Sequence, residues 1–197
     1  MSKSRVVTRI VSLVAFGSAL AFAAACGGGG GGSSGGATQP DAEGSGTDGA
    51  KPAAAGSAAE IQGAYITGDG PKSLADAKGK VVIVDFWATY CQPCKKSFPK
   101  YQELVEQFGG ELAVIAVSVD EPGDVDEAKL KEFASGTKVK FPIIWDKEHK
   151  TAEAYKPPKM PTSFIIDKEG NVAHQHAGYE SGEEEKIAEE VKKLLGK

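Results

Sequence analysis

Residues 81–94 read VVIVDFWATYCQPC and join a strand signal to a cysteine pair. The first half is a continuous apolar and β-branched run, typical of a strand buried on both faces of a sheet. Cys91 and Cys94 follow where that strand gives way to a helix. We expect Cys91 at the helix N-terminus, where unpaired N–H groups and the helix dipole favour a thiolate. Cys94 would lie one turn further along and resolve a mixed disulfide, so the sequence predicts a redox dithiol.

The charge of the chain is mildly acidic. It has 197 residues and a formal net charge of −4 at pH 7. Residues 1–60 contain four basic and four acidic side chains, so the negative balance belongs to residues 61–197. Those residues, about 137, suffice for one compact domain. A mildly acidic domain argues against nucleic acid as a partner.

The first 25 residues have the organisation of an export signal. Three basic residues precede an apolar stretch over 10–25, which is too short and wrongly flanked for a membrane span. Residues 23–26 read AAAC and resemble a bacterial lipobox, in which the cysteine becomes the lipidated N-terminus of the mature protein. We therefore expect lipidation of Cys26, with plain cleavage at an Ala-x-Ala site as the alternative. Lipidation also removes the odd cysteine among the three.

Small and polar residues dominate the segment after Cys26. Up to about Glu60 it contains no aromatic and no large aliphatic residue, so it cannot support a core. About 34 residues of this type span roughly 30 Å root-mean-square as a flexible chain. The predicted organisation is a signal peptide at 1–25, an anchor cysteine and flexible linker at 26–60, and a domain at 61–197.

The domain alternates strand and helix patterns. Strands are expected at 80–86, 111–119, 142–145, 162–167 and 171–177, and helices at 92–108, 125–134, 149–155 and 183–195. Gly170 can take the positive φ of a hairpin turn, so the last two strands should pair antiparallel. The pattern predicts an α/β domain with a central mixed sheet flanked by helices on both faces.

This order, with Cys-x-x-Cys after the first central strand, resembles the thioredoxin fold. The motifs are similar to those of the TlpA/ResA-type thioredoxin-like proteins tethered to bacterial membranes. The resemblance covers about residues 65–195. It rests on four stretches, namely SLAD at 73–76, GK at 79–80, VDFWATYCQPC at 84–94 and MPTSFIID at 160–167 with Gly170.

The resemblance implies a role for each motif residue. Cys91 would attack, Cys94 would resolve, and Pro161 would be a cis-proline beside the dithiol. A cis X-Pro bond costs little and removes an N–H where an incoming peptide backbone comes close. An ordinary turn proline is the alternative. The expected substrate-contacting residues are Met160, Trp87, Tyr90, Gln92 and Pro93. Trp87 is included only as a neighbour of the dithiol, because packing in the core or at the rim of the site is its favoured role.

Two departures from the family concern acid–base chemistry. The glutamate that commonly follows the second cysteine by three residues is replaced by Ser97, and the frequent asparagine before Phe-Trp-Ala is replaced by Asp85. A carboxylate in a buried strand should have a raised pKa and could take the proton of Cys94. We therefore expect Asp85 to act as general base. A purely structural, hydrogen-bonded carboxylate is the alternative.

The implied activity is that of an extracytoplasmic or periplasmic thiol–disulfide oxidoreductase. Its clients would be exported proteins with disulfides, including apocytochromes c during cytochrome c biogenesis. A membrane dithiol donor would supply electrons, and no cofactor is expected beyond the redox-active disulfide Cys91–Cys94. We expect a monomer anchored to a membrane through lipid. Gly27 is not the aspartate of an inner-membrane retention signal, which favours the outer membrane.

Other functions fit the sequence less well. A copper-binding chaperone of the same fold would use Cys91, Cys94 and a histidine as soft ligands, but usually spaces its cysteines by three residues. A peroxidase of the same superfamily normally lacks a partner cysteine two residues away. His174 and His176 lie on one side of a predicted strand, which is compatible with a metal, but exposed edge histidines are commoner. We expect no metal site.

Overall fold

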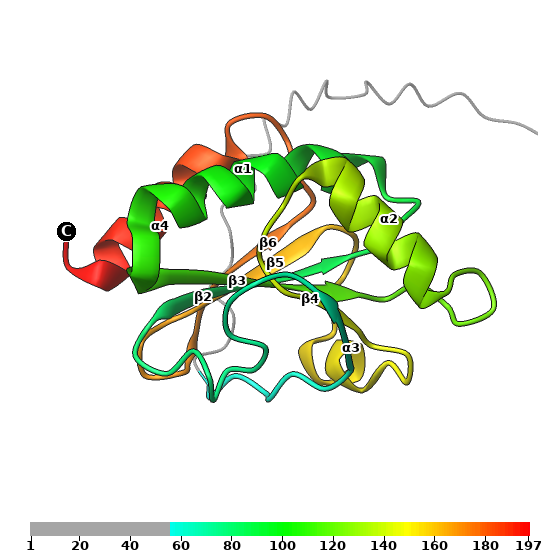
Figure 1. The fold of residues 1–197 in the computed structure, drawn as a ribbon. Coiled ribbons are helices and arrows are strands. Elements are labelled where there is room, and N and C mark those ends of the chain that lie inside the picture. The colour runs from blue at the N-terminus through cyan, green and yellow to red at the C-terminus, as the bar shows by residue number, and fades with distance from the viewer. Residues whose placement is uncertain (1–55) are drawn as a thin grey trace, which may run out of the picture. The chain divides into compact units, whose positions relative to one another are not determined.

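The computed structural model describes residues 56–197. The predicted signal peptide, Cys26 and most of the predicted linker lie outside these residues. Six strands form one mixed sheet in the order β1-β4-β3-β2-β5-β6 (Figure 1). The strands are β1 (Ala64–Thr67), β2 (Val81–Trp87), β3 (Leu112–Ser118), β4 (Ile143–Trp145), β5 (Thr162–Ile166) and β6 (Val172–Ala177). The predicted mixed sheet is confirmed.

Strand β2 lies near the centre of this sheet. It pairs parallel with β3 and antiparallel with β5, while β6 pairs antiparallel with β5. All seven residues of β2 are buried, as are all seven of β3, which explains their continuous apolar sequences. Asp85 is the one charged residue of β2. A carboxylate is therefore held in the middle of the core.

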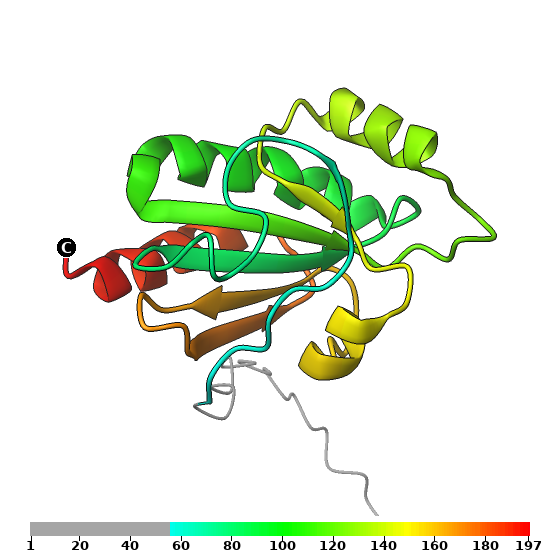
Figure 2. The same ribbon diagram turned by 60° about the horizontal axis from the view of Figure 1, so that its bottom comes forward.

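Helices cover both faces of the sheet. The helices are α1 (Gln92–Phe108), η1 (Gly109–Glu111), α2 (Glu127–Thr137), α3 (Lys150–Tyr155) and α4 (Glu183–Leu195). Side chains of α1, α2 and α4 form one core cluster with the sheet, and α3 packs into the second cluster on the opposite face (Figures 1 and 2). None of the helices within residues 56–197 has the length and apolarity needed to cross a membrane.

The predicted helices and strands agree with the structure, but the edge strand β1 was not predicted. Helices α1 and α4 have the predicted bounds, and the other predicted elements differ by up to three residues at an end. Helix α2 begins at Glu127 because the side chain of Asp126 caps it by accepting from the Lys129 N–H. Strand β1 has four residues, a single buried side chain at Ile66, and an irregular register with β4.

The contacts of the domain also reach back into the predicted linker. Ser57 forms a β-bridge with Asn171, and the Ala58 N–H donates to the Gly170 carbonyl at 2.8 Å. The hydroxyl of Tyr155 donates to the carbonyl of Ala59 at 2.7 Å. These contacts use the backbone of residues 57–59, so the small side chains that indicated a linker do not prevent them.

Candidate active site

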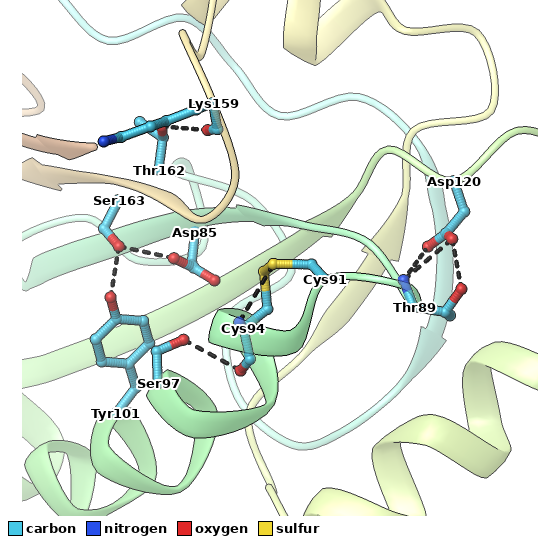
Figure 3. The surroundings of a disulfide bond; sticks show 10 residues. All are labelled: Asp85, Thr89, Cys91, Cys94, Ser97, Tyr101, Asp120, Lys159, Thr162 and Ser163. Atoms are coloured by element: carbon cyan, nitrogen blue, oxygen red, sulfur yellow. Dashed lines mark hydrogen bonds between the residues drawn. A yellow bond between two sulfur atoms is a disulfide. The ribbon is translucent and has the colours of Figure 1, made fainter. Parts of the chain in front are cut away.

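The two cysteines are joined by a disulfide bond at the start of α1 (Figure 3). Cys91 is the N-cap residue, and the Cys94 N–H donates to its Sγ at 3.2 Å. Pro93 lies in the first turn, where a missing N–H costs no helical hydrogen bond. Cys91 is 6% exposed and Cys94 is fully buried. Cys91 is therefore the sulfur that an outside thiol or disulfide reaches first.

A cis peptide bond joins Met160 to Pro161 directly before β5. Two hydrogen bonds hold this turn, from the Thr162 hydroxyl to the Lys159 carbonyl at 2.6 Å and from the Gly178 N–H to the Pro161 carbonyl at 2.7 Å. Thr162 pairs with Phe86 near the end of β2. Pro161 therefore lies beside the end of β2, where the chain leaves the sheet toward Cys91. The expected cis geometry is present.

Asp85 lies wholly inside the domain, on the sheet face covered by α1. The Ser163 hydroxyl donates to its Oδ1 at 2.7 Å, whereas Oδ2 has no hydrogen-bond partner within residues 56–197. Burial raises the pKa of this carboxyl to about 7, although the hydrogen bond from Ser163 opposes the shift. A carboxyl with this pKa exchanges its proton near neutral pH, which a general base requires.

Tyr101 of α1 completes this buried polar group. Its hydroxyl lies 2.7 Å from the Ser163 Oγ, and Figure 3 shows Tyr101, Ser163 and Asp85 joined in one chain of hydrogen bonds. Sequence reasoning did not select Ser163 or Tyr101 as site residues. The available signal was a serine directly after the Pro-Thr pair and a tyrosine on the buried face of α1, and neither reveals which hydroxyls meet.

Ser97 does not replace the glutamate of the family as an acid–base group. It is fully buried, and its hydroxyl donates to the Cys94 carbonyl at 3.1 Å within α1. Such a local bond satisfies the hydroxyl inside the helix. Figure 3 shows the carboxyl of Asp85, instead, on the Cys94 side of the disulfide.

A second carboxylate fixes the loop before Cys91. Asp120 accepts from the Thr89 N–H at 3.1 and 3.0 Å and from the Thr89 hydroxyl at 2.6 Å (Figure 3). The Ser118 hydroxyl donates to the same carboxylate at 2.8 Å, and the Trp145 indole donates to the Asp120 carbonyl at 2.8 Å. Sequence reasoning missed this contact, which joins loops 31 residues apart.

The predicted substrate-contacting residues fall into two groups. Tyr90 is 67% exposed, Gln92 and Pro93 are exposed, and Met160 is half-buried. Tyr90, Gln92 and Pro93 are sequence neighbours of the two cysteines, and Met160 belongs to the cis turn. These four side chains are therefore accessible to a substrate. For Trp87 the predicted substrate contact is wrong, because the side chain is fully buried. Its ring stacks on Phe133 with centroids 4.4 Å apart, so it packs the core beneath the site and cannot contact a substrate.

The two histidines of β6 form ion pairs with α4. His176 lies 2.6 Å from Glu183 through Nδ1 and 2.6 Å from Glu190 through Nε2. Burial lowers the pKa of His176, but its hydrogen bonds to the carboxylates of Glu190 and Glu183 outweigh burial, so the pKa is raised. His174 lies 3.5 Å from Glu190. Within residues 56–197 no group of three or more His, Cys, Asp or Glu side chains is arranged to hold a metal ion.

Comparisons with known proteins agree with this geometry. The model of the AhpC/TSA family matches residues 56–175, more than half of the chain. The thioredoxin-like protein YneN of Bacillus subtilis (strain 168) is 37% identical over 106 residues, which are 54% of this chain and 61% of that protein. The thiol-disulfide oxidoreductase ResA of Bacillus anthracis is 37% identical over 112 residues, 56% of this chain and 62% of that protein. The chain thus spans about three fifths of the length of these relatives.

A solved structure gives the same result for the fold. A protein of Chlorobium tepidum assigned to the thiol:disulfide interchange protein DsbE is 29% identical, with a TM-score of 0.63. The match covers 72% of this chain and 97% of that one. The thioredoxin-like fold and the resemblance to ResA-type proteins that the motifs predicted are confirmed.

Proposed function

The chain belongs to the AhpC/TSA family, and from this membership and the geometry of its dithiol we propose that it is a thiol–disulfide oxidoreductase acting through Cys91 and Cys94. One observation carries the proposal. A Cys91–Cys94 disulfide lies at the start of α1, and Figure 3 shows the Asp85 carboxyl, whose pKa burial raises to about 7, on the Cys94 side of that disulfide. The names of the ResA and DsbE relatives support the same reaction class.

The mechanism follows from the different access to the two sulfurs. In the reduced enzyme the Cys91 thiolate attacks a client disulfide, and the first client sulfur leaves as a thiolate and takes up a proton. Asp85 then accepts the Cys94 proton, and the Cys94 thiolate attacks the Cys91 Sγ. This step forms the Cys91–Cys94 disulfide and releases the second client thiolate. The client gains two electrons and the enzyme dithiol loses two.

The clients and the electron donor are proposed from the sequence. An export signal and a lipobox-like cysteine at Cys26 support an extracytoplasmic, lipid-anchored enzyme. The outer membrane is the favoured destination. The clients would then be exported proteins with disulfides, including apocytochromes c, and a membrane dithiol protein would return electrons to Cys91–Cys94. A copper-chaperone function is not favoured, since the relatives are named as oxidoreductases or thioredoxin-like proteins.

Reduction of insulin by dithiothreitol, followed by turbidity, tests the proposed activity. The protein should accelerate the reaction, and Cys91→Ser should abolish the acceleration because it removes the attacking sulfur. Cys94→Ser should instead accumulate a mixed disulfide between Cys91 and the client, which a reductant releases. Ser97→Ala is the matched control, because the one hydrogen bond of its hydroxyl within residues 56–197 is to the Cys94 carbonyl of α1. Full activity in Cys91→Ser would contradict the proposal.

A further inference from the structure

Three strands place polar side chains in one row across the sheet. Asp85 of β2 pairs directly with Ser163 of β5, and Ser163 pairs directly with His176 of β6. Side chains of directly paired residues point to the same face of a sheet and lie close together. Here that face is covered by α1 and α4. The row therefore runs from the centre of the core to the ion pairs of His176.

Ser163 supplies the hydrogen bond that holds the carboxyl of Asp85. Its Oγ lies 2.7 Å from Asp85 Oδ1 and 2.7 Å from the Tyr101 hydroxyl, and each of these three residues is at most 1% exposed. A hydroxyl has one proton to donate and two lone pairs to accept with. When Ser163 donates to an ionised Asp85 it can accept from Tyr101.

We propose that Ser163, backed by Tyr101, is a positioning residue for resolution, because it holds Asp85 by Oδ1 and leaves Oδ2 free for the Cys94 proton. The inference deepens the proposed function and rests on it. In the resolution step the S–H bond of Cys94 breaks and its proton moves to Asp85 Oδ2. The Cys94 sulfur attacks the Cys91 Sγ, the S–S bond between Cys91 and the client breaks, and the client sulfur leaves as a thiolate. The Ser163 hydrogen bond stabilises the ionised base before the transfer.

The groups around Asp85 and Ser163 favour a positioning role for Ser163. Helix α1 contributes Cys94 and Tyr101, whereas the β3 partner of Asp85 is the uncharged Ala116. Burial and then the charge of Asp85 hold the pKa of Tyr101 well above its usual value, so Tyr101 keeps its proton as a donor. The more distant charged and titratable groups on this side belong to β6, α4 and the segment between them: His176, Tyr179, Glu183 and Glu190.

A purely structural role for the two hydroxyls makes a different prediction. Loss of the buried hydrogen bonds would then lower stability but would not move the pH dependence of resolution. A positioning role moves that pH dependence, because removing a hydrogen bond to the ionised form raises the pKa of the base. The pH profile of resolution therefore separates the two roles.

The test measures single-turnover resolution of a preformed mixed disulfide between Cys91 and a small aromatic thiol, from pH 5 to 10. The wild-type rate should rise with a midpoint near pH 7, the pKa of Asp85. Ser163→Ala should move the midpoint up by about one pH unit, which lowers the rate at pH 7 about fivefold and leaves the rate at pH 10 unchanged. Ser163→Thr should restore the wild-type midpoint.

Two further variants keep the result interpretable. Tyr101→Phe should move the midpoint in the same direction by less, and it serves if Ser163→Ala does not fold. Ser97→Ala removes a different buried hydroxyl next to the dithiol and should leave the midpoint unchanged. Unmoved midpoints in both Ser163→Ala and Tyr101→Phe would overturn the positioning role alone. A wild-type enzyme that does not reduce insulin would overturn the proposed function instead.

Discussion

The carboxylate of Asp120 holds Thr89 by both its backbone N–H and its hydroxyl, at distances of 2.6–3.1 Å. Thr89 lies two residues before Cys91, and Asp120 lies just beyond the end of β3. This contact fastens the loop that leads into the disulfide to the neighbouring strand. The position of Cys91 is therefore set by the sheet as well as by α1.

Replacing Asp120 should loosen this loop. Asp120→Ala leaves the Thr89 and Ser118 donors without their acceptor in a buried place, which should lower the free energy of unfolding by about 2–4 kcal/mol. Urea unfolding of the oxidised protein measures the change. Asp124→Ala, at an exposed position in the same segment between β3 and α2, is the control and should change stability by less than about 0.5 kcal/mol. Equal effects of the two substitutions would show that the contact is not needed.

Asp85 should make stability fall as pH rises. Its folded pKa of about 7 lies above the usual value of 3.8, so the folded protein binds the proton more tightly than the unfolded chain does. Wild-type stability should therefore decrease between about pH 4 and pH 7. Asp85→Asn cannot ionise, so relative to wild type it should gain up to about 4 kcal/mol across that range. Urea unfolding at pH 4 and pH 8 tests this, and a constant difference between the two proteins would contradict it.

The same variant should be a poorer enzyme. Asp85→Asn removes the proton acceptor for Cys94 and leaves Cys91 accessible, so the first attack should proceed and resolution should slow by about 10²-fold or more at pH 7. Rapid mixing with a client disulfide, followed by acid quenching, separates the two steps. Unchanged resolution in Asp85→Asn would leave Asp85 a structural residue.

His176 should stabilise the docking of α4 at acidic and neutral pH. Its folded pKa is raised, so its contribution is fully present below the unfolded value of about 6.5 and is lost as pH rises through the folded value. His176→Gln should cost about 2 kcal/mol at pH 6 and less at pH 9. His174→Gln is the control, because that ring lies 3.5 Å from Glu190 and has no second ion pair within residues 56–197. A loss for His176→Gln that does not change with pH would refute the ionic role.

Local patterns predicted most of the fold because they act within a few residues. The largely apolar run of 81–87 requires burial on both faces, so this strand was found with an error of one residue at each end. The spacing in 183–195 requires one buried helical face, and this helix was found with its bounds unchanged. The cysteine pair and the cis bond before Pro161 followed from motifs. Strand β1 was missed because four residues with one buried side chain give no periodic signal.

The polar contacts of the site could not be predicted, because they join residues far apart in the chain. Ser163 and Asp85 are 78 positions apart, and Tyr101 and Ser163 are 62 apart. Which hydroxyl meets which carboxylate depends on strand register and on how α1 lies over the sheet. The burial of Trp87 is a similar case, since the partner that covers it, Phe133, belongs to α2.

The midpoint potential of Cys91–Cys94 tests the central claim most directly. The protein is equilibrated in thiol–disulfide buffers of graded potential, and free thiols are counted by mass after alkylation. We predict one reversible two-electron transition in which both cysteines change together, with a midpoint at or below about −250 mV, as a reductant of client disulfides requires. A midpoint near −120 mV, typical of a disulfide donor, or the absence of a reversible transition would contradict the account.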